Sequence, residues 1–207
     1  PGVDSWGKLQ SPPLIQSGDI MSGLPFFSIR PKAPVIELFP EKKWIQFQNN
    51  KVITDDGLEL VKHFEGLYLN AYLDPVKIPT IGFGRIVYPD GTRVKMGDTC
   101  TKEQAEAWLV SDLNTEAAHY LRAWVKVEMK PHEWSALCSF VFNRGPKRFK
   151  EILPLVNEKK SQEVANSLLT YDWAMDNGEK KVLKGLARRR RAEAKMFLNE
   201  NWRTEIL

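Results

Sequence analysis

The sequence predicts an α+β fold for the main domain, with a small sheet near its start and helices behind it. A helical pattern of apolar residues is followed at once by two short segments rich in aromatic and β-branched residues, and the later apolar patterns are helical. Strands gathered before a run of helices are typical of α+β domains. The 207 residues are enough for one good core plus an appendage, or for two small units.

The first helix and both strands are predicted within residues 52–84. Gly66 is placed to end a helix whose apolar residues recur at helical spacing: Leu58, Val61, Phe64 and Leu67. Residues 68–74 (YLNAYLD) and 78–84 (IPTIGFG) are typical of short strands, and YPDG at residues 88–91 is typical of a turn.

Further helices are predicted behind the sheet. Thr101 and Gln104 form a capping-box pattern that opens a helix over residues 101–121. Residues 133–143 follow as a buried helix, with an apolar face of Trp134, Leu137, Cys138, Val141 and Phe142. Ser161 is placed to cap a helix over residues 162–169, and a basic helix from about residue 185 to 199 closes the chain.

Residues 1–50 differ from the rest because they hold seven of the thirteen prolines and show no helical period. Proline at this density predicts extended or irregular chain. The segment is also apolar, so we expect it to pack on the main domain, residues 51–207, as a strap. A small wall-binding or docking module is the alternative, although about 50 residues without a disulfide or a metal make a marginal domain.

The net charge of +4 and the pI near 9.0 make the chain mildly basic. Such a balance suits anionic polymers, including nucleic acid, acidic lipid surfaces and bacterial cell wall. The run Arg188–Arg191 offers phosphate contacts, but no base-reading helix or stacking platform accompanies it. Nucleic-acid binding is therefore not favoured.

Cysteine and histidine usage predicts neither a metal site nor a cofactor. Cys100 and Cys138 are far apart in sequence and have no histidine partner pattern, so two buried small side chains are favoured, with a disulfide left open. No apolar run reaches the roughly 18–20 residues of a membrane span. The first residues lack the layout of a secretory signal, and we expect a soluble, monomeric protein made in a cytoplasm.

One short window, residues 63–84, holds the side chains with the clearest chemical potential. Glu65 falls in the last turn of the predicted helix beside apolar residues, a setting that favours a protonated carboxyl and hence a general acid. Asp74 follows in a more polar turn and should stay ionised, and Thr80 on the next strand can help to hold a water. Strand alternation puts Thr80 and Gly82 on one face. Taken singly, each residue also has an ordinary role at a helix end, turn or strand.

The window resembles the signature of the phage-type lysozymes, the endolysins of glycoside hydrolase family 24. Glu65-Gly66, Asp74 and the run from Thr80 to Gly84 match that signature in identity and spacing. Further blocks follow in the same order as in the family: TKEQAEAWLVSD, SFVFNRG and GLARRRRAEAKMFL. The resemblance spans roughly residues 52–200 and implies a lysozyme-like fold with a small hairpin lobe and a mainly helical lobe.

The resemblance also implies the roles of individual residues. Glu65 would be the general acid, and Asp74 with Thr80 would orient or activate the attacking water. The bond cut would be the β-1,4 link between N-acetylmuramic acid and N-acetylglucosamine of peptidoglycan, with inversion. Asn143 matches a cleft-lining position, Tyr72 is a candidate sugar-facing aromatic, and Arg188 or Arg189 would pair with the catalytic glutamate.

Two departures from the family pattern concern the small lobe. Arg85 stands where the family usually has a histidine, and a common glycine between Asp74 and Thr80 is replaced within PVKIP. A third follows Asn143, where the residues PKRFKEILP replace the family's small and hydroxyl residues on the far side of the cleft.

Three functions fit the resemblance. We favour an endolysin that reaches the periplasm and cell wall from the host cytoplasm through a holin-like pore. A virion-associated lysozyme that uses residues 1–50 for docking is the second. A catalytically inactive wall-binding protein on the same fold is the third, and the intact Glu65, Asp74 and Thr80 speak against it.

Overall fold

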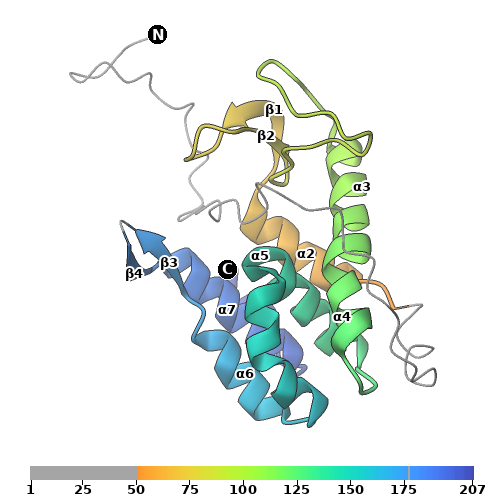
Figure 1. Ribbon diagram of the computed structural model, residues 1–207, viewed down its shortest axis with the longest axis vertical. Helices are drawn as coiled ribbons and strands as arrows, with labels where there is room; N and C mark the ends of the chain where they lie inside the picture. The colour runs from red at the N-terminus through yellow and green to blue at the C-terminus, as the bar shows by residue number, and fades with distance from the viewer. Residues whose placement is uncertain (1–50, 177) are drawn as a thin grey trace.

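The computed structural model describes residues 51–176 and 178–207. Figure 1 shows a small lobe that contains strands β1 and β2, with helix α3 running from it along the larger helical lobe. The predicted α+β class, with a hairpin lobe and a mainly helical lobe, is confirmed. The expectation that residues 1–50 form a strap or a docking module concerns a segment outside the described residues.

Helix α2 (Asp55–Glu65) opens the described chain and ends one residue before Gly66, as predicted. The side chain of Thr54 caps it by accepting a hydrogen bond from the Gly57 N–H, and Asp55 and Asp56 complement the helix dipole in the first turn. Gly66 takes a φ of 71°, which turns the chain sharply toward the small lobe. Glu65 therefore lies at the junction of the two lobes.

The small lobe is built on an antiparallel hairpin of β1 (Tyr68–Leu73) and β2 (Pro79–Gly82), close to the two predicted strands. Tyr72 pairs with Thr80 in its register. The predicted YPDG turn is also present, because the Gly91 N–H donates to the Tyr88 carbonyl at 3.0 Å.

The turn between β1 and β2 closes without the glycine that the family commonly has there. The Asp74 N–H donates to the Ile78 carbonyl at 3.0 Å, and the Lys77 N–H donates to the Asp74 carbonyl at 2.8 Å. Lys77 takes a φ of 64°, in the left-handed region that favours glycine. The turn therefore closes with Lys77 in a strained backbone conformation.

Replacing Lys77 by Gly is expected to raise the free energy of unfolding by about 0.5–1 kcal/mol, because relief of the left-handed strain outweighs the added freedom of the unfolded chain. Urea unfolding followed by circular dichroism measures the change. Lys77→Ala is the control: it shortens the side chain, keeps the strain and should bring no gain. Equal stability of Lys77→Gly and Lys77→Ala would contradict the strain.

Arg85, which replaces a family histidine, finds its partner on helix α3 (Lys102–Asp112). Its Nη2 lies 2.6 Å from the Asp112 Oδ1, its Nη1 donates to the Val87 carbonyl, and its guanidinium lies 5.5 Å from the centre of the Trp108 ring. The two charged side chains are 10% and 15% exposed, so solvent screens the pair only weakly. Arg85 thus links the small lobe to α3.

The predicted helix over residues 101–121 consists of three segments. Helix α3 begins with the predicted capping box of Thr101 and Gln104. A π-helical turn at Leu113–Ala117 follows, and helix α4 covers Ala118–Trp124. A π-helical turn re-phases the side chains that come after it, which apolar spacing alone does not reveal.

Helix α5 (Pro131–Asn157) runs through the helical lobe and carries much of the core. Of the predicted apolar face, Phe142 is only partly buried, whereas the others are buried: Trp134, Leu137, Cys138 and Val141. Gly145, with φ of 77° and ψ of 170°, breaks the helix into two parts. The residues PKRFKEILP begin the second part. Cys100 and Cys138 are both buried and free, so the favoured reading of two small buried side chains is confirmed.

The last helices match the prediction except at one cap. Helix α6 covers Ser161–Leu169, but Ser161 is its first helical residue and the cap position belongs to Lys160, which makes no side-chain capping bond. The expected Ser161 cap is therefore wrong by one residue. Helix α7 (Lys184–Phe197) is the predicted basic helix, and a 3-10 helix at Trp202–Glu205 follows it.

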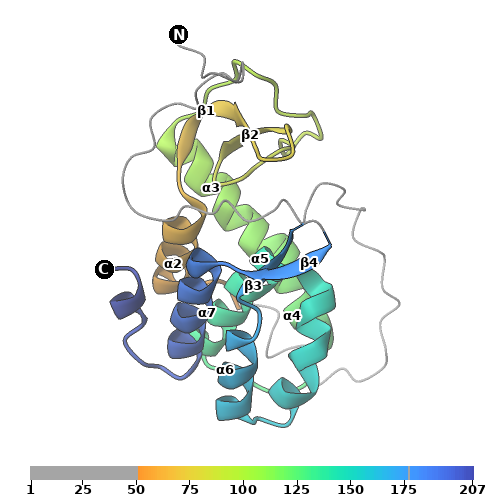
Figure 2. The ribbon, with the colours of Figure 1, turned by 90° about the vertical axis from the view of Figure 1, so that its left-hand side faces the viewer.

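A second hairpin, of β3 (Trp173–Asp176) and β4 (Glu179–Val182), was not predicted. It precedes α7 and stands apart from the β1–β2 hairpin in Figure 2. Trp173 is partly buried, and its ring lies close to three cations, at 4.8 Å from the Arg144 guanidinium, 5.3 Å from that of Arg148 and 4.3 Å from the Lys180 Nζ. Cation–π contacts of this kind hold the hairpin on α5.

Within the described ranges, none of the helices combines the length and the apolar character that crossing a membrane requires.

Candidate active site

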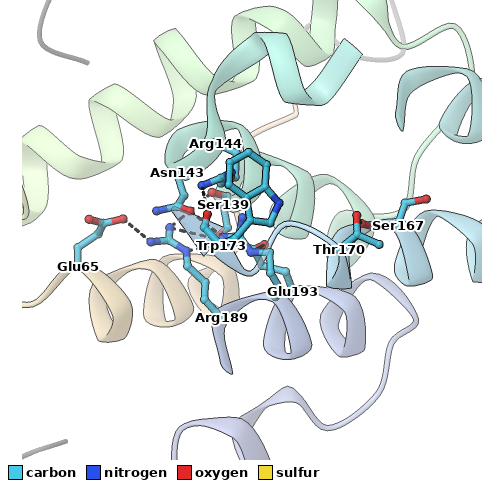
Figure 3. A network of polar contacts seen from close by, with 10 residues as sticks. Glu65, Ser139, Asn143, Arg144, Ser167, Thr170, Trp173, Arg189 and Glu193 are labelled. Atoms are coloured by element: carbon cyan, nitrogen blue, oxygen red, sulfur yellow. Dashed lines mark hydrogen bonds and ion pairs between the residues drawn. The ribbon is translucent and has the colours of Figure 1, made fainter. Parts of the chain in front are cut away.

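Glu65 is held at the end of α2 by an arginine of α7. The Arg189 Nη1 lies 2.5 Å from the Glu65 Oε1, and the two side chains are 3% and 13% exposed. Figure 3 shows the glutamate reaching toward the guanidinium. Arg188, the other candidate in the basic run, instead donates its Nε to the Glu205 carbonyl. Arg189 is therefore the partner of Glu65.

The surroundings of Glu65 are less apolar than the sequence predicts. Phe64 does lie near, with its ring centre 5.9 Å from the Arg189 guanidinium, but a positive charge touches the carboxyl itself. Burial alone would lower the pKa of Arg189, yet the nearby carboxylates of Glu65 and Glu193 outweigh it and raise that pKa. Arg189 thus stays charged beside the Glu65 carboxyl.

Asp74 is buried in the β1–β2 turn, with only 7% of its surface exposed, although a more polar setting was expected. Its Oδ1 accepts hydrogen bonds from the N–H groups of Val76 and Ile78, at 2.9 and 2.8 Å. Its Oδ2 is buried and accepts no hydrogen bond from the described residues. One carboxylate oxygen shapes the turn, and the other keeps its full capacity to accept a proton or a hydrogen bond.

Thr80 lies opposite Tyr72 across the hairpin and is also buried. Its Oγ1 donates to the Ile78 carbonyl at 3.0 Å, in the same turn that Asp74 organises. The alternation expected from the strand is blurred because Thr80, Ile81 and Gly82 are all buried. Thr80 and Asp74 are thus linked through the Ile78 backbone, and no hydrogen bond joins their side chains directly.

Tyr72 connects the two carboxylates electrostatically. Its ring packs against Tyr68, with ring centres 4.2 Å apart, and its side chain is partly buried. Burial raises the pKa of the Tyr72 hydroxyl, and the proximity of Tyr68, Glu65 and Asp74 raises it further. The phenol therefore stays protonated over the working pH range.

Asn143 on α5 lies just above the Arg189 guanidinium in the view of Figure 3. Its Oδ1 accepts a hydrogen bond from the Arg190 Nη2 at 3.0 Å, and the residue is partly exposed. No group of three or more His, Cys, Asp or Glu side chains that could hold a metal ion occurs in the described part of the chain.

The sequence matches the profile of the family described as phage lysozyme over residues 62–193. The endolysin of Salmonella phage P22 is 35% identical over 150 residues, which cover 71% of this chain and 98% of the relative. The chain belongs to the phage lysozyme family. It is therefore a glycoside hydrolase of the lysozyme type.

Solved structures agree with this lysozyme fold. The endolysin from Escherichia coli O157:H7 phage FAHEc1 superposes with a TM-score of 0.68 at 34% identity, covering 72% of this chain and 95% of that one. The muramidase domain of SpmX from Asticaccaulis excentricus superposes with a TM-score of 0.64 at 33% identity, covering 72% and 98%.

Three residues of this phage lysozyme that sequence reasoning missed lie behind Arg189: Ser139, Arg190 and Glu193. Glu193 is fully buried and its Oε1 accepts from the Ser139 Oγ at 2.6 Å. The available signal was the position of Glu193, four residues after Arg189 and between apolar neighbours at Ala192 and Ala194. A charged residue on the buried face of a helix marks a paired charge.

Proposed function

We propose that this lysozyme hydrolyses the β-1,4 bond between N-acetylmuramic acid and N-acetylglucosamine of peptidoglycan. The single observation that carries the proposal is the pair of differently held carboxyl groups: Glu65 contacts Arg189 at the end of α2, and Asp74 keeps a buried oxygen without a donor in the β1–β2 turn. These two carboxyl groups supply the acid and the base that glycoside hydrolysis needs.

Glu65 serves as the general acid that protonates the leaving sugar oxygen. It is fixed at the end of α2 and clamped by Arg189, so its orientation is set before substrate arrives. A general acid must be protonated in part of the enzyme population, and the clamp works against this.

Asp74 serves as the base that orients and activates the attacking water, with Thr80 shaping the same turn. The Asp74 Oδ2 has no hydrogen-bond donor among the described residues, which leaves it available to accept from a water. A water between carboxylate and sugar corresponds to single displacement, with inversion at the anomeric carbon. Tyr72 and Asn143 are the further residues that we propose contact the glycan.

We infer a role in host cell lysis, in which residues 51–207 form the catalytic domain of an endolysin. The monomeric enzyme is synthesised in the host cytoplasm, passes through a holin-dependent opening and acts on the wall from the periplasm. The basic surface of the domain, including exposed Lys180 and Lys184, favours approach to an anionic envelope.

Mass spectrometry of digested, purified peptidoglycan tests the reaction. Products with reducing N-acetylmuramic acid ends are expected, because water is the nucleophile. Proton NMR in the first minutes of digestion should show the α-anomer of the new end, since a β-linked sugar is inverted. Anhydro ends would indicate a lytic transglycosylase, and an initial β-anomer would indicate retention.

A further inference from the structure

The helix that supplies Arg189 carries an unusual concentration of buried charge. Arg190 and Glu193 are each 0% exposed and Arg189 is 2% exposed. Burial lowers the pKa of Arg190 to about 9, which still leaves its guanidinium charged at neutral pH. Burying a charged group away from water costs free energy unless the group is paired with an opposite charge and hydrogen-bonded. Two buried positive charges and one buried negative charge therefore have to be balanced within this network.

Glu193 is shared between both arginines. Its Oε1 accepts hydrogen bonds from the Arg189 Nε at 3.2 Å and from the Arg190 Nη2 at 2.9 Å, and its Oε2 lies 2.9 Å from the Arg190 Nε. Ser139 of α5 donates to the same carboxylate. The carboxylate thereby fixes the side of the Arg189 guanidinium opposite to the one that touches Glu65 (Figure 3).

We propose that Glu193 is a positioning residue that holds Arg189 against Glu65 and offsets enough of the buried positive charge to keep Glu65 able to carry a proton. The role of Glu193 depends on the proposed role of Glu65 as general acid. The physical reason is that a guanidinium in contact with a carboxyl favours its ionised form, whereas a general acid has to be protonated before it can act. A second carboxylate on the same guanidinium reduces that bias.

The charged and titratable groups around the Glu65–Arg189 pair lie on helices α7, α5 and α2 and in the small lobe. Helix α7 presents Arg189, Arg190 and Glu193, and the small lobe presents Tyr68, Tyr72 and Asp74. Helix α5 presents Arg144, which repels Arg190, together with the uncharged Ser139 and Asn143. On α2 itself, His63 neighbours Glu65 and faces Glu59 and Arg188. Among the α7 charges, Glu193 alone is negative.

The first variant is Glu193→Gln, which keeps the volume and removes the negative charge. Carbon-13 NMR of the Glu65 carboxyl, assigned by its loss in Glu65→Gln, should show the titration midpoint moving down by about one pH unit. The alkaline limb of kcat against pH should move in the same direction, with kcat reduced about 10-fold at neutral pH and KM changed little.

The second variant, Arg190→Gln, removes one positive charge and should move the Glu65 midpoint in the opposite direction, to higher pH. It leaves Arg189 and Glu193 as a matched pair, so it supplies the test even where Glu193→Gln fails to fold. The double variant restores the net charge and should titrate near the wild-type midpoint. Because Arg190 also contacts Asn143, the readout for these two variants is the titration rather than kcat.

Glu205→Gln is the matched control, since Glu205 also binds two cations of α7, Arg191 and Lys195, but on its solvent-facing side. It should leave the Glu65 midpoint unchanged. The proposal would be overturned if both variants fold and Glu65 titrates in each at the wild-type midpoint. Glu193 would then have only a structural role. The titration needs no substrate, so a missing muramidase activity would refute the proposed function without affecting this result.

Discussion

Replacing Glu65 by Gln is expected to lower kcat on purified peptidoglycan by about 10³-fold, because the variant keeps the contact with Arg189 but has no proton to give. The fold should persist, since the Gln carbonyl can still accept the hydrogen bond from the Arg189 Nη1 that the carboxylate accepts now. The loss of turbidity of permeabilised Gram-negative cells measures the rate, and circular dichroism measures the fold.

Glu59→Gln is the control for this experiment. Glu59 lies on the same helix, and its carboxylate is exposed and paired with Arg203. Its removal takes an equal charge from α2 without touching the junction of the lobes, so activity should stay at the wild-type level. Wild-type lysis by Glu65→Gln would exclude Glu65 as the general acid.

Replacing Asp74 by Asn is expected to lower kcat by about 10²–10³-fold while leaving stability nearly unchanged. The two carboxylate oxygens of Asp74 have different contacts. Oδ1 accepts hydrogen bonds from the N–H groups of Val76 and Ile78, whereas Oδ2 accepts none from the described residues. The side-chain carbonyl of an Asn can still accept the two turn hydrogen bonds, but its amide nitrogen cannot accept a proton from water. Initial rates of reducing-end release, with urea unfolding in parallel, separate the two effects.

Two further variants sharpen this test. Asp74→Ala should lose activity and also about 2 kcal/mol of stability, because two turn N–H groups lose their partner. Asp90→Asn should retain activity, because Asp90 makes a similar turn contact with the Thr92 N–H at 2.9 Å in the exposed 88–91 turn. Full activity of Asp74→Asn would assign the activation of water to another group.

Much of the architecture could be predicted from local sequence. The helix that ends before Gly66, the strands on either side of PVKIP and the capping box at Thr101 depend on contacts between neighbours in sequence, and all three are present. The β3–β4 hairpin had a local signal as well, because Asn177-Gly178 is a pair favoured in tight hairpin turns. Apolar alternation does not mark β4, because its residues EKKV are mostly charged.

The register of the arginine run could not be read from the sequence. Arg188 to Arg191 point in four directions about 100° apart around α7, and local sequence gives each the same chemistry. Packing of α7 on α5 buries Arg189 and Arg190 and leaves Arg191 exposed. The choice of Arg189 as the partner of Glu65 is thus a property of the packed helices.

By itself the sequence determined the fold class, the family and the positions of Glu65, Asp74 and Thr80, because these depend on local patterns and on motif spacing. Only the tertiary structure decided the environment of each group. It put a guanidinium on Glu65 where an apolar setting was expected, buried Asp74 with one unsatisfied oxygen, and placed Glu193 behind Arg189. Charge and burial at a carboxyl are set by residues up to 124 positions away, and only folding brings these together.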